Sequence, residues 1–173
     1  MLKYSLYLLS IVLFLISCDK SVSTSAADVK VDSSKSIVKN IPINDSGYEF
    51  SMDWPKELTD QGVNPTIKYN ETSGVLEIFA GNKIQIEVTD EAMSLNDIKK
   101  ELQGNQMFTY KFHEETDDGY IFQAVLPDGS TYFYNFLVQK TIGTTTYLFK
   151  NRDNEEFTLR DIKLMKKIAA SAK

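Results

Sequence analysis

The sequence predicts an α+β fold, in which a mostly antiparallel sheet of six to eight strands is joined by one internal helix and one C-terminal helix. Short runs of alternating apolar and polar residues recur between residues 47 and 150. Runs of this kind, separated by turn-forming residues, are typical of antiparallel strands. Two stretches, at 94–104 and 158–169, instead repeat apolar residues at helical spacing.

The expected strands follow from this alternation and from the turns between them. Glycine, asparagine, aspartate and proline mark turns at 72–74, 81–82, 117–119 and 127–129. The strands predicted between them are 47–52, 66–69, 75–79, 83–88, 107–114, 120–126, 130–139 and 144–150. Strict alternation in 83–88 predicts a half-solvated strand near an edge of the sheet. The run 130–139 is apolar on both faces, which predicts a central strand covered on both sides.

Two helices are predicted from their start signals and apolar stripes. Ser94 is a good N-cap, with Asp97 three residues on, and Gly104 stands where the helix would end. Thr158 and Asp161 repeat this start signal before the last helix. The apolar stripe of that helix comprises Leu159, Ile162, Met165, Ile168 and Ala169. Helices covering both faces of the sheet would make an α/β/α sandwich.

The N-terminus has the order of features expected of a secretion signal that ends at a cysteine. Lys3 supplies a positive charge, residues 4–16 are mostly apolar, and the small Ser17 precedes Cys18, the only cysteine. An apolar run of 13 residues is shorter than the ~20 that a membrane-spanning helix needs. Leu15-Ile16-Ser17-Cys18 resembles the lipobox of bacterial lipoproteins. The resemblance implies that residues 1–17 are a signal peptide, that Cys18 carries acyl chains such as palmitate, and that cleavage precedes it.

A change in composition separates the anchor from the domain. Residues 18–40 are rich in serine and charged residues and contain no aromatic residue. Such a segment cannot bury enough apolar surface to offset its ordering entropy, which predicts a flexible tether. Residues 41–173 then form one α+β domain. The anchored chain faces the periplasm, and the residues after Cys18 do not distinguish the inner from the outer membrane.

The domain resembles the PsbP-like superfamily in the order of its elements. An aromatic strand leads into Trp54-Pro55, a short helix begins at Ser94-Leu95, and an aromatic meander from Tyr120 to Phe149 precedes a closing helix. The resemblance covers about residues 46–171. It implies a non-enzymatic protein that binds or stabilises a larger assembly, and no site residue carries over from it.

Charge and residue types argue against several kinds of chemistry. Without residues 1–17, the chain has 24 acidic and 18 basic residues. This net negative charge argues against binding to nucleic acid. His113 is the only histidine, and one histidine cannot build a typical metal site. The acidic residues at 117–118 and 153–156 lack the spacing of a calcium loop and fit solvated turns. We therefore expect no enzyme activity, no cofactor and no metal.

Aromatic side chains are the remaining signal for a site. Most of them must form the core, but Tyr132, Tyr134 and Phe136 share one face of a strand and are candidates for a binding face. The sequence predicts a lipid-anchored envelope protein that binds or assembles a protein partner. Two alternatives stay open: a carrier of a small molecule or glycan with an aromatic pocket, and an envelope hydrolase inhibitor or immunity factor with an acidic loop at 153–156.

Overall fold

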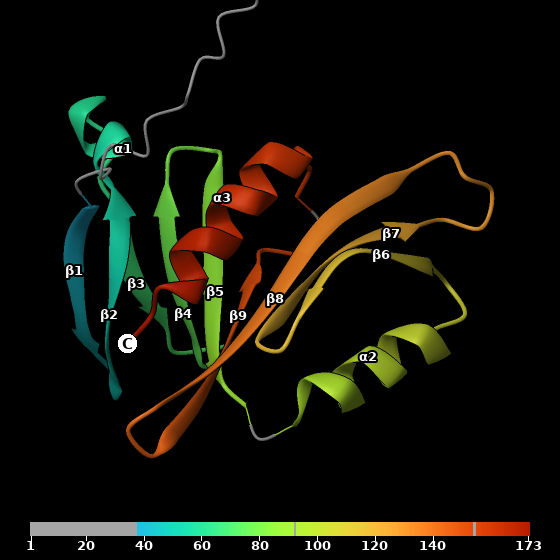
Figure 1. Ribbon diagram of the computed structural model, residues 1–173, viewed down its shortest axis with the longest axis horizontal. Helices are drawn as coiled ribbons and strands as arrows, with labels where there is room; N and C mark the ends of the chain where they lie inside the picture. Colours follow the sequence, from blue (N-terminus) through green and yellow to red (C-terminus); the bar gives the residue numbers. More distant parts are fainter. Residues whose placement is uncertain (1–37, 92, 154) are drawn as a thin grey trace, which may run out of the picture. The chain divides into compact units, whose positions relative to one another are not determined.

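The main element of the domain is a seven-stranded antiparallel sheet (Figure 1). The computed structural model describes residues 38–91, 93–153 and 155–173, and the predicted signal peptide, Cys18 and residues 19–37 lie outside them. The strand order is β3-β4-β5-β9-β8-β7-β6. The strands are β3 (Thr66–Asn70), β4 (Val75–Ala80), β5 (Ile84–Asp90), β6 (Thr109–Thr116), β7 (Gly119–Val125), β8 (Tyr132–Ile142) and β9 (Thr145–Asn151). The predicted α+β class and mostly antiparallel sheet are confirmed.

A separate two-stranded sheet precedes the main sheet. β1 (Val38–Asp45) pairs with β2 (Tyr48–Pro55) through a turn at Ser46 and Gly47, both with positive φ. Such a turn matches the twist of a hairpin. Residues 38–40, which the composition assigns to the tether, therefore belong to β1. Pro42 is tolerated in this strand because β1 pairs on one side only.

The described residues contain three helices, one more than the sequence predicts. α1 (Lys56–Asp60) is a single short turn directly after β2 and has no side-chain cap. α2 (Leu95–Gly104) and α3 (Leu159–Ala170) begin as predicted. Ser94 Oγ accepts a hydrogen bond from the Asp97 N–H, and Thr158 and Asp161 form a reciprocal capping box.

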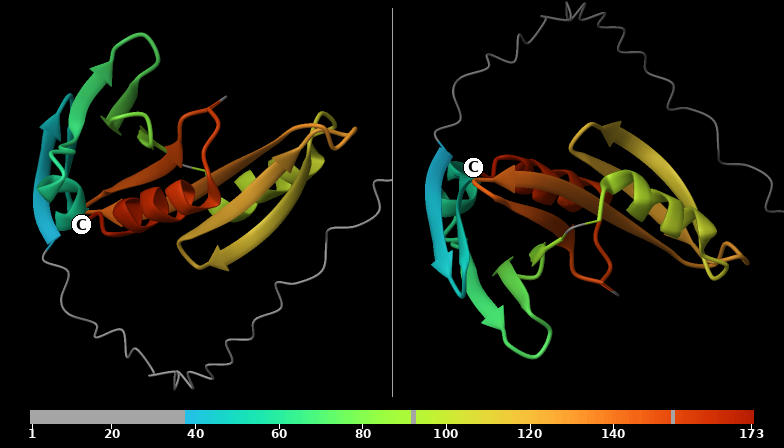
Figure 2. Two further views of the ribbon diagram at one scale, coloured as in Figure 1. Left: turned by 90° about the horizontal axis from the view of Figure 1, so that it is seen from above. Right: turned by 90° about the horizontal axis from the view of Figure 1, so that it is seen from below.

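The two long helices cover opposite faces of the sheet (Figure 2). On one face, α3 and the β1–β2 hairpin enclose the larger core, which includes the fully buried Trp54, Phe136 and Phe149. On the other face, α2 packs Leu95, Ile98 and Leu102 against the aromatic side chains of β6 and β7. The predicted cover on both faces is therefore present over β6–β9, whereas α2 does not reach β3–β5 on its face.

The position of β5 differs from its prediction. Its alternation suggests a strand near an edge, but β5 lies between β4 and β9 in the interior of the sheet. Ile84, Ile86 and Val88 are buried under α3, whereas Gln85 and Glu87 point to the face that α2 leaves open. A strand can alternate because only one of its faces is covered, wherever it lies in the sheet.

Candidate functional site

The main irregularity of the sheet is the unequal length of β8 and β9. The two strands pair from Ile142↔Thr145 to Leu137↔Lys150, and β9 then continues alongside β5 as far as Ile86↔Asn151. On its other side β8 pairs with β7 over residues 132–138. Among the described residues, positions 132–136 of β8 therefore have a strand neighbour on the β7 side alone, and in Figure 1 this end of β8 extends past the end of β9.

Three hydrogen bonds establish which backbone groups of β8 point to the open side. The Leu126 N–H donates to Thr131 O at 3.0 Å and the Gln139 N–H donates to Asp118 O at 2.8 Å, so these odd-numbered residues of the β8 segment direct their peptide groups toward β7. The Phe136 N–H points the other way. Because direction alternates along a strand, Tyr132 and Tyr134 direct their N–H and C=O groups to the side that β9 has left.

A buried asparagine ends the β8–β9 ladder. Asn151 is 2% exposed, and its Oδ1 accepts the Phe136 N–H at 2.9 Å. Its Nδ2 donates to Asn135 Oδ1 at 3.1 Å and to Arg152 O at 3.2 Å. The side chain thus replaces the next backbone partner of β8 at the point where β9 turns away. Beyond Phe136, within the described part of the chain, no strand pairs with β8 on this side.

Two of the three aromatic residues predicted to bind lie at this open edge. Tyr132 is 53% exposed, and its ring meets that of the half-buried Tyr134 edge to face, with ring centres 5.5 Å apart. The His113 ring lies 5.7 Å from that of Tyr134, at the point where a bulge shifts the register of β6. Phe136 is fully buried, so it belongs to the core and is not on the accessible face.

A groove runs beside these tyrosines. Its volume is about 490 Å³, within the ~300–1,000 Å³ typical of ligand sites. One wall comes from β8 and the residues before it, and the other from the segment that leads into α3. The lining residues are Ser130, Thr131, Tyr132, Tyr134, Glu156, Phe157, Thr158 and Leu159. Three of these residues are aromatic, Ser130, Thr131 and Thr158 carry hydroxyl groups, and Glu156 is the charged residue, so the groove is mixed aromatic and polar with one acidic side chain.

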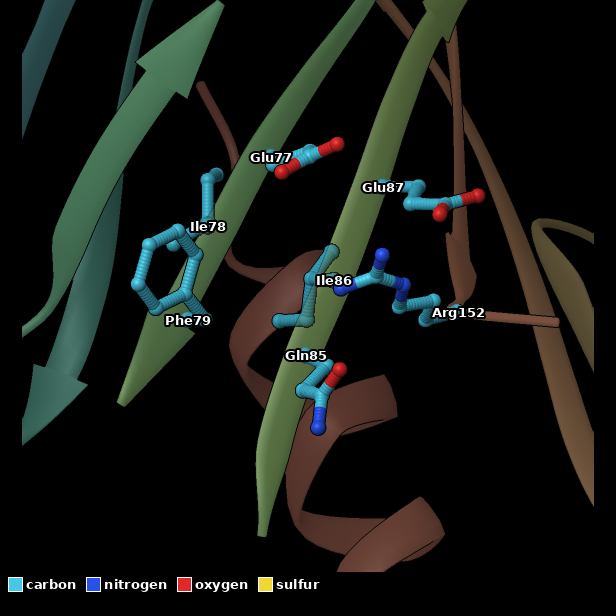
Figure 3. A pocket seen from close by; sticks show the side chains of 7 residues that line it. All are labelled: Glu77, Ile78, Phe79, Gln85, Ile86, Glu87 and Arg152. Carbon is cyan, nitrogen blue, oxygen red and sulfur yellow. The ribbon is translucent and has the colours of Figure 1, made fainter. Parts of the chain in front are cut away.

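A smaller hollow lies on the opposite face, over β4 and β5 (Figure 3). Its volume is about 10 Å³, which holds no more than a water molecule. Glu77 and Glu87 stand directly opposite each other there, an unfavourable pairing of like charges. Asn70 Nδ2 donates to Glu77 at 3.1 Å, and Lys150 Nζ lies 3.4 Å from Glu87. Through these contacts, both glutamates beside the hollow have a polar or positively charged partner.

Lys150 is held in its charged form by the carboxylates around it. Burial lowers the pKa of Lys150, but hydrogen bonds and charges from Asp153 and Glu87 outweigh it, and the net pKa is raised. Asp153 Oδ2 lies 2.6 Å from Lys150 Nζ, and Asp118 Oδ2 lies 2.9 Å from Lys140 Nζ. One carboxylate from each of the two acidic segments is therefore paired with a lysine. Among the described residues, no three His, Cys, Asp or Glu side chains gather as a metal ion would require.

Comparison with known proteins finds no match to a protein-family model, to a curated protein or to a solved structure. In the part of the chain that the structure describes, no helix has the length and apolar character of a membrane span. The sequence alone made Tyr132 and Tyr134 candidates for binding, and it did not reveal the open edge beside them. The predicted strand lengths pointed to this open edge, because the strand predicted at 130–139 is longer than its partner predicted at 144–150.

Proposed function

We propose that the protein is a lipid-anchored, non-enzymatic binding module that holds a protein partner at the periplasmic side of a bacterial envelope membrane. The observation that carries this proposal is the pair Tyr132 and Tyr134, which lines a groove of mixed aromatic and polar residues at an open sheet edge. Tyrosine is enriched in protein interfaces because its ring offers apolar area and its hydroxyl offers a hydrogen bond.

The anchor part of the proposal rests on the N-terminal sequence. Leu15-Ile16-Ser17-Cys18 supplies a thiol for acylation, and buried acyl chains contribute ~0.8 kcal/mol per CH₂. The mature chain has a net charge of −6, with 18 basic and 24 acidic residues, so its surface is repelled by anionic lipids. The lipid, and not the protein surface, then holds the module at the membrane and confines its encounters to that plane.

We also propose that the domain is a PsbP-like α/β/α sandwich. The placement of α2 and α3 on opposite faces of the main sheet supports this assignment. The superfamily resemblance implies a role in binding and stabilising larger assemblies, in agreement with a binding module.

The anchor is tested with the variant Cys18→Ala in the full chain. Without the thiol, we expect no labelling by radioactive palmitate, and either release from the membrane or an uncleaved signal peptide visible as a larger product. Ser21→Ala, three residues further on, is the matched control and should be labelled and processed normally. Unchanged size and unchanged membrane fractionation of Cys18→Ala would contradict the lipid anchor.

The binding module is tested by photo-cross-linking in living cells. A benzoylphenylalanine at position 132 of the full chain should cross-link one envelope protein, identified by mass spectrometry. The control position is Met107, which is 69% exposed and lies outside the groove lining. Cross-links of the same pattern from both positions, or none from position 132, would contradict a partner at this face.

A second candidate function is a carrier of a small molecule or glycan. The groove favours it by combining two tyrosine rings with the hydroxyls of Ser130 and Thr131 and the carboxylate of Glu156. A thermal-shift screen with small sugars separates the two functions. A stabilising sugar, together with no cross-linked protein at position 132, would replace the protein partner by a glycan.

A further inference from the structure

The end of β8 combines an open backbone edge with an adjacent groove. Tyr132 and Tyr134 direct backbone N–H and C=O groups to a side where, among the described residues, no strand pairs with them. The groove of about 490 Å³ lies along the same side. Open strand edges are templates for pairing with another chain, so proteins usually block them.

Two other edges of this domain show such blocking. On β6 the outer edge is interrupted by a bulge next to His113 and carries Lys111 and two glutamates. On β2 the side away from β1 is taken by the last residue of the chain, since Ser51 and Lys173 exchange backbone hydrogen bonds at 2.9 and 3.0 Å. By contrast, no strand in the described part of the chain pairs with β8 where its edge meets the groove.

We infer that the partner binds as an added strand: an extended peptide segment pairs with the backbone of Tyr132 and Tyr134 and places a lysine or arginine beside Glu156. This inference rests on the proposed function and specifies how the partner is recognised. Alternating N–H and C=O groups at ~3.3–3.4 Å per residue select an extended polypeptide over other ligands. Two outward-facing residues offer four hydrogen bonds to one such segment.

The residues that line the groove indicate which side chains the bound peptide should carry. Residues that alternate toward the groove meet the exposed ring of Tyr132 and the segment Glu156–Leu159, so apolar and β-branched side chains fit there. Glu156 is the charged residue of the lining, and a cation beside it also finds tyrosine rings, which attract cations through their faces. The N-terminus of α3 does not compete for the ligand, because Thr158 and Asp161 already cap it.

The first experiment asks whether the edge is open in the free protein. Hydrogen–deuterium exchange is measured at single residues of the lipidated full chain in detergent micelles. We expect the Tyr132 and Tyr134 amides to exchange at least 100-fold faster than that of Val138, which lies opposite Phe149 within the β8–β9 ladder. The Phe136 amide should be protected by Asn151. A Tyr134 amide as slow as that of Val138 would overturn the inference.

The second experiment identifies the ligand chemistry with a phage library of random heptapeptides, selected on the full chain. We expect enriched peptides that contain lysine or arginine among β-branched or aromatic residues and lack central proline. The best peptide is then synthesised in two N-methylated forms, one methylated on each set of alternate amides. One form should lose at least tenfold in affinity, and the other should stay within threefold, because the side chains are the same and only the edge-facing donors differ.

Protein variants provide the matched control for the charge. Glu156→Gln should weaken binding of a lysine-containing peptide three- to tenfold, whereas Glu155→Gln, outside the groove lining, should leave it unchanged. Equal binding of both N-methylated forms, or no enrichment from the library, would overturn strand addition. If cross-linking from position 132 persists in that case, the binding module stands without it. If cross-linking is absent as well, the proposed function fails too.

Discussion

Asn151 allows a quantitative test of how the sheet is built around its open edge. The substitution Asn151→Ala removes the acceptor of the Phe136 N–H and both donors of the amide group. The residue is 2% exposed and the Phe136 side chain is fully buried, so water cannot easily replace the lost acceptor. The other two partners, Asn135 and Arg152, are half-buried and exposed, respectively, and can turn to solvent.

The expected change in the free energy of unfolding follows from the burial of these hydrogen-bond partners. An unsatisfied buried donor costs about 1–3 kcal/mol, and hydrogen bonds to groups that recover water contribute about 0.5 kcal/mol each or less. We therefore expect Asn151→Ala to lower the free energy of unfolding by about 2–3 kcal/mol. Asn44, an exposed asparagine of β1, is the matched control. Asn44→Ala should change the free energy of unfolding by no more than about 0.5 kcal/mol.

The assay is urea unfolding of residues 19–173, followed by tryptophan fluorescence. Trp54 is the only tryptophan and is fully buried, so its emission reports loss of the core. With a urea slope of roughly 1–3 kcal/mol/M, the expected loss moves the midpoint by about 0.7–3 M. A midpoint for Asn151→Ala that coincides with wild type, at an unchanged slope, would refute the argument that this side chain replaces a backbone partner.

Two further predictions concern stability. Gly119→Ala should cost about 1–3 kcal/mol in urea unfolding, because a Cβ there would lie 2.1 Å from Leu137 O, whereas Gly104→Ala meets no atom within 4 Å and should be neutral or stabilising. The pKa of Asp118 is lowered, first by the hydrogen bond from Lys140 and then by that from Thr116. Its stabilising contribution is therefore complete above the ordinary pKa of about 3.9 and is lost as the pH falls through the lowered folded-state pKa. Asp118→Asn should accordingly lose less stability than wild type between pH 6 and pH 3, and an equal loss in both proteins would contradict this pairing.

The sequence was informative wherever structure depends on residues a few positions apart. The helix starts at Ser94 and Thr158 were predictable because a cap joins residues three apart. The strands of the main sheet were predictable within a few residues because alternation and turn residues are local signals. α1 and β1 were missed for the same reason: α1 has no side-chain cap, and β1 contains Pro42 and several polar residues.

Pairing between distant segments was decided by the tertiary structure alone. β5 and β9 lie about 60 residues apart in the chain but are neighbours in the sheet, which moves β5 away from an edge. β9 pairs with β5 and β8 at once and ends at Asn151, so among the described residues no strand follows β8 beyond that point on this side. The alternation of Tyr132, Tyr134 and Phe136 placed them on one face, but α3 covers only part of that face. Local patterning determined which residues share a face, and packing across the sheet decided that Phe136 is core and that Tyr132 meets solvent.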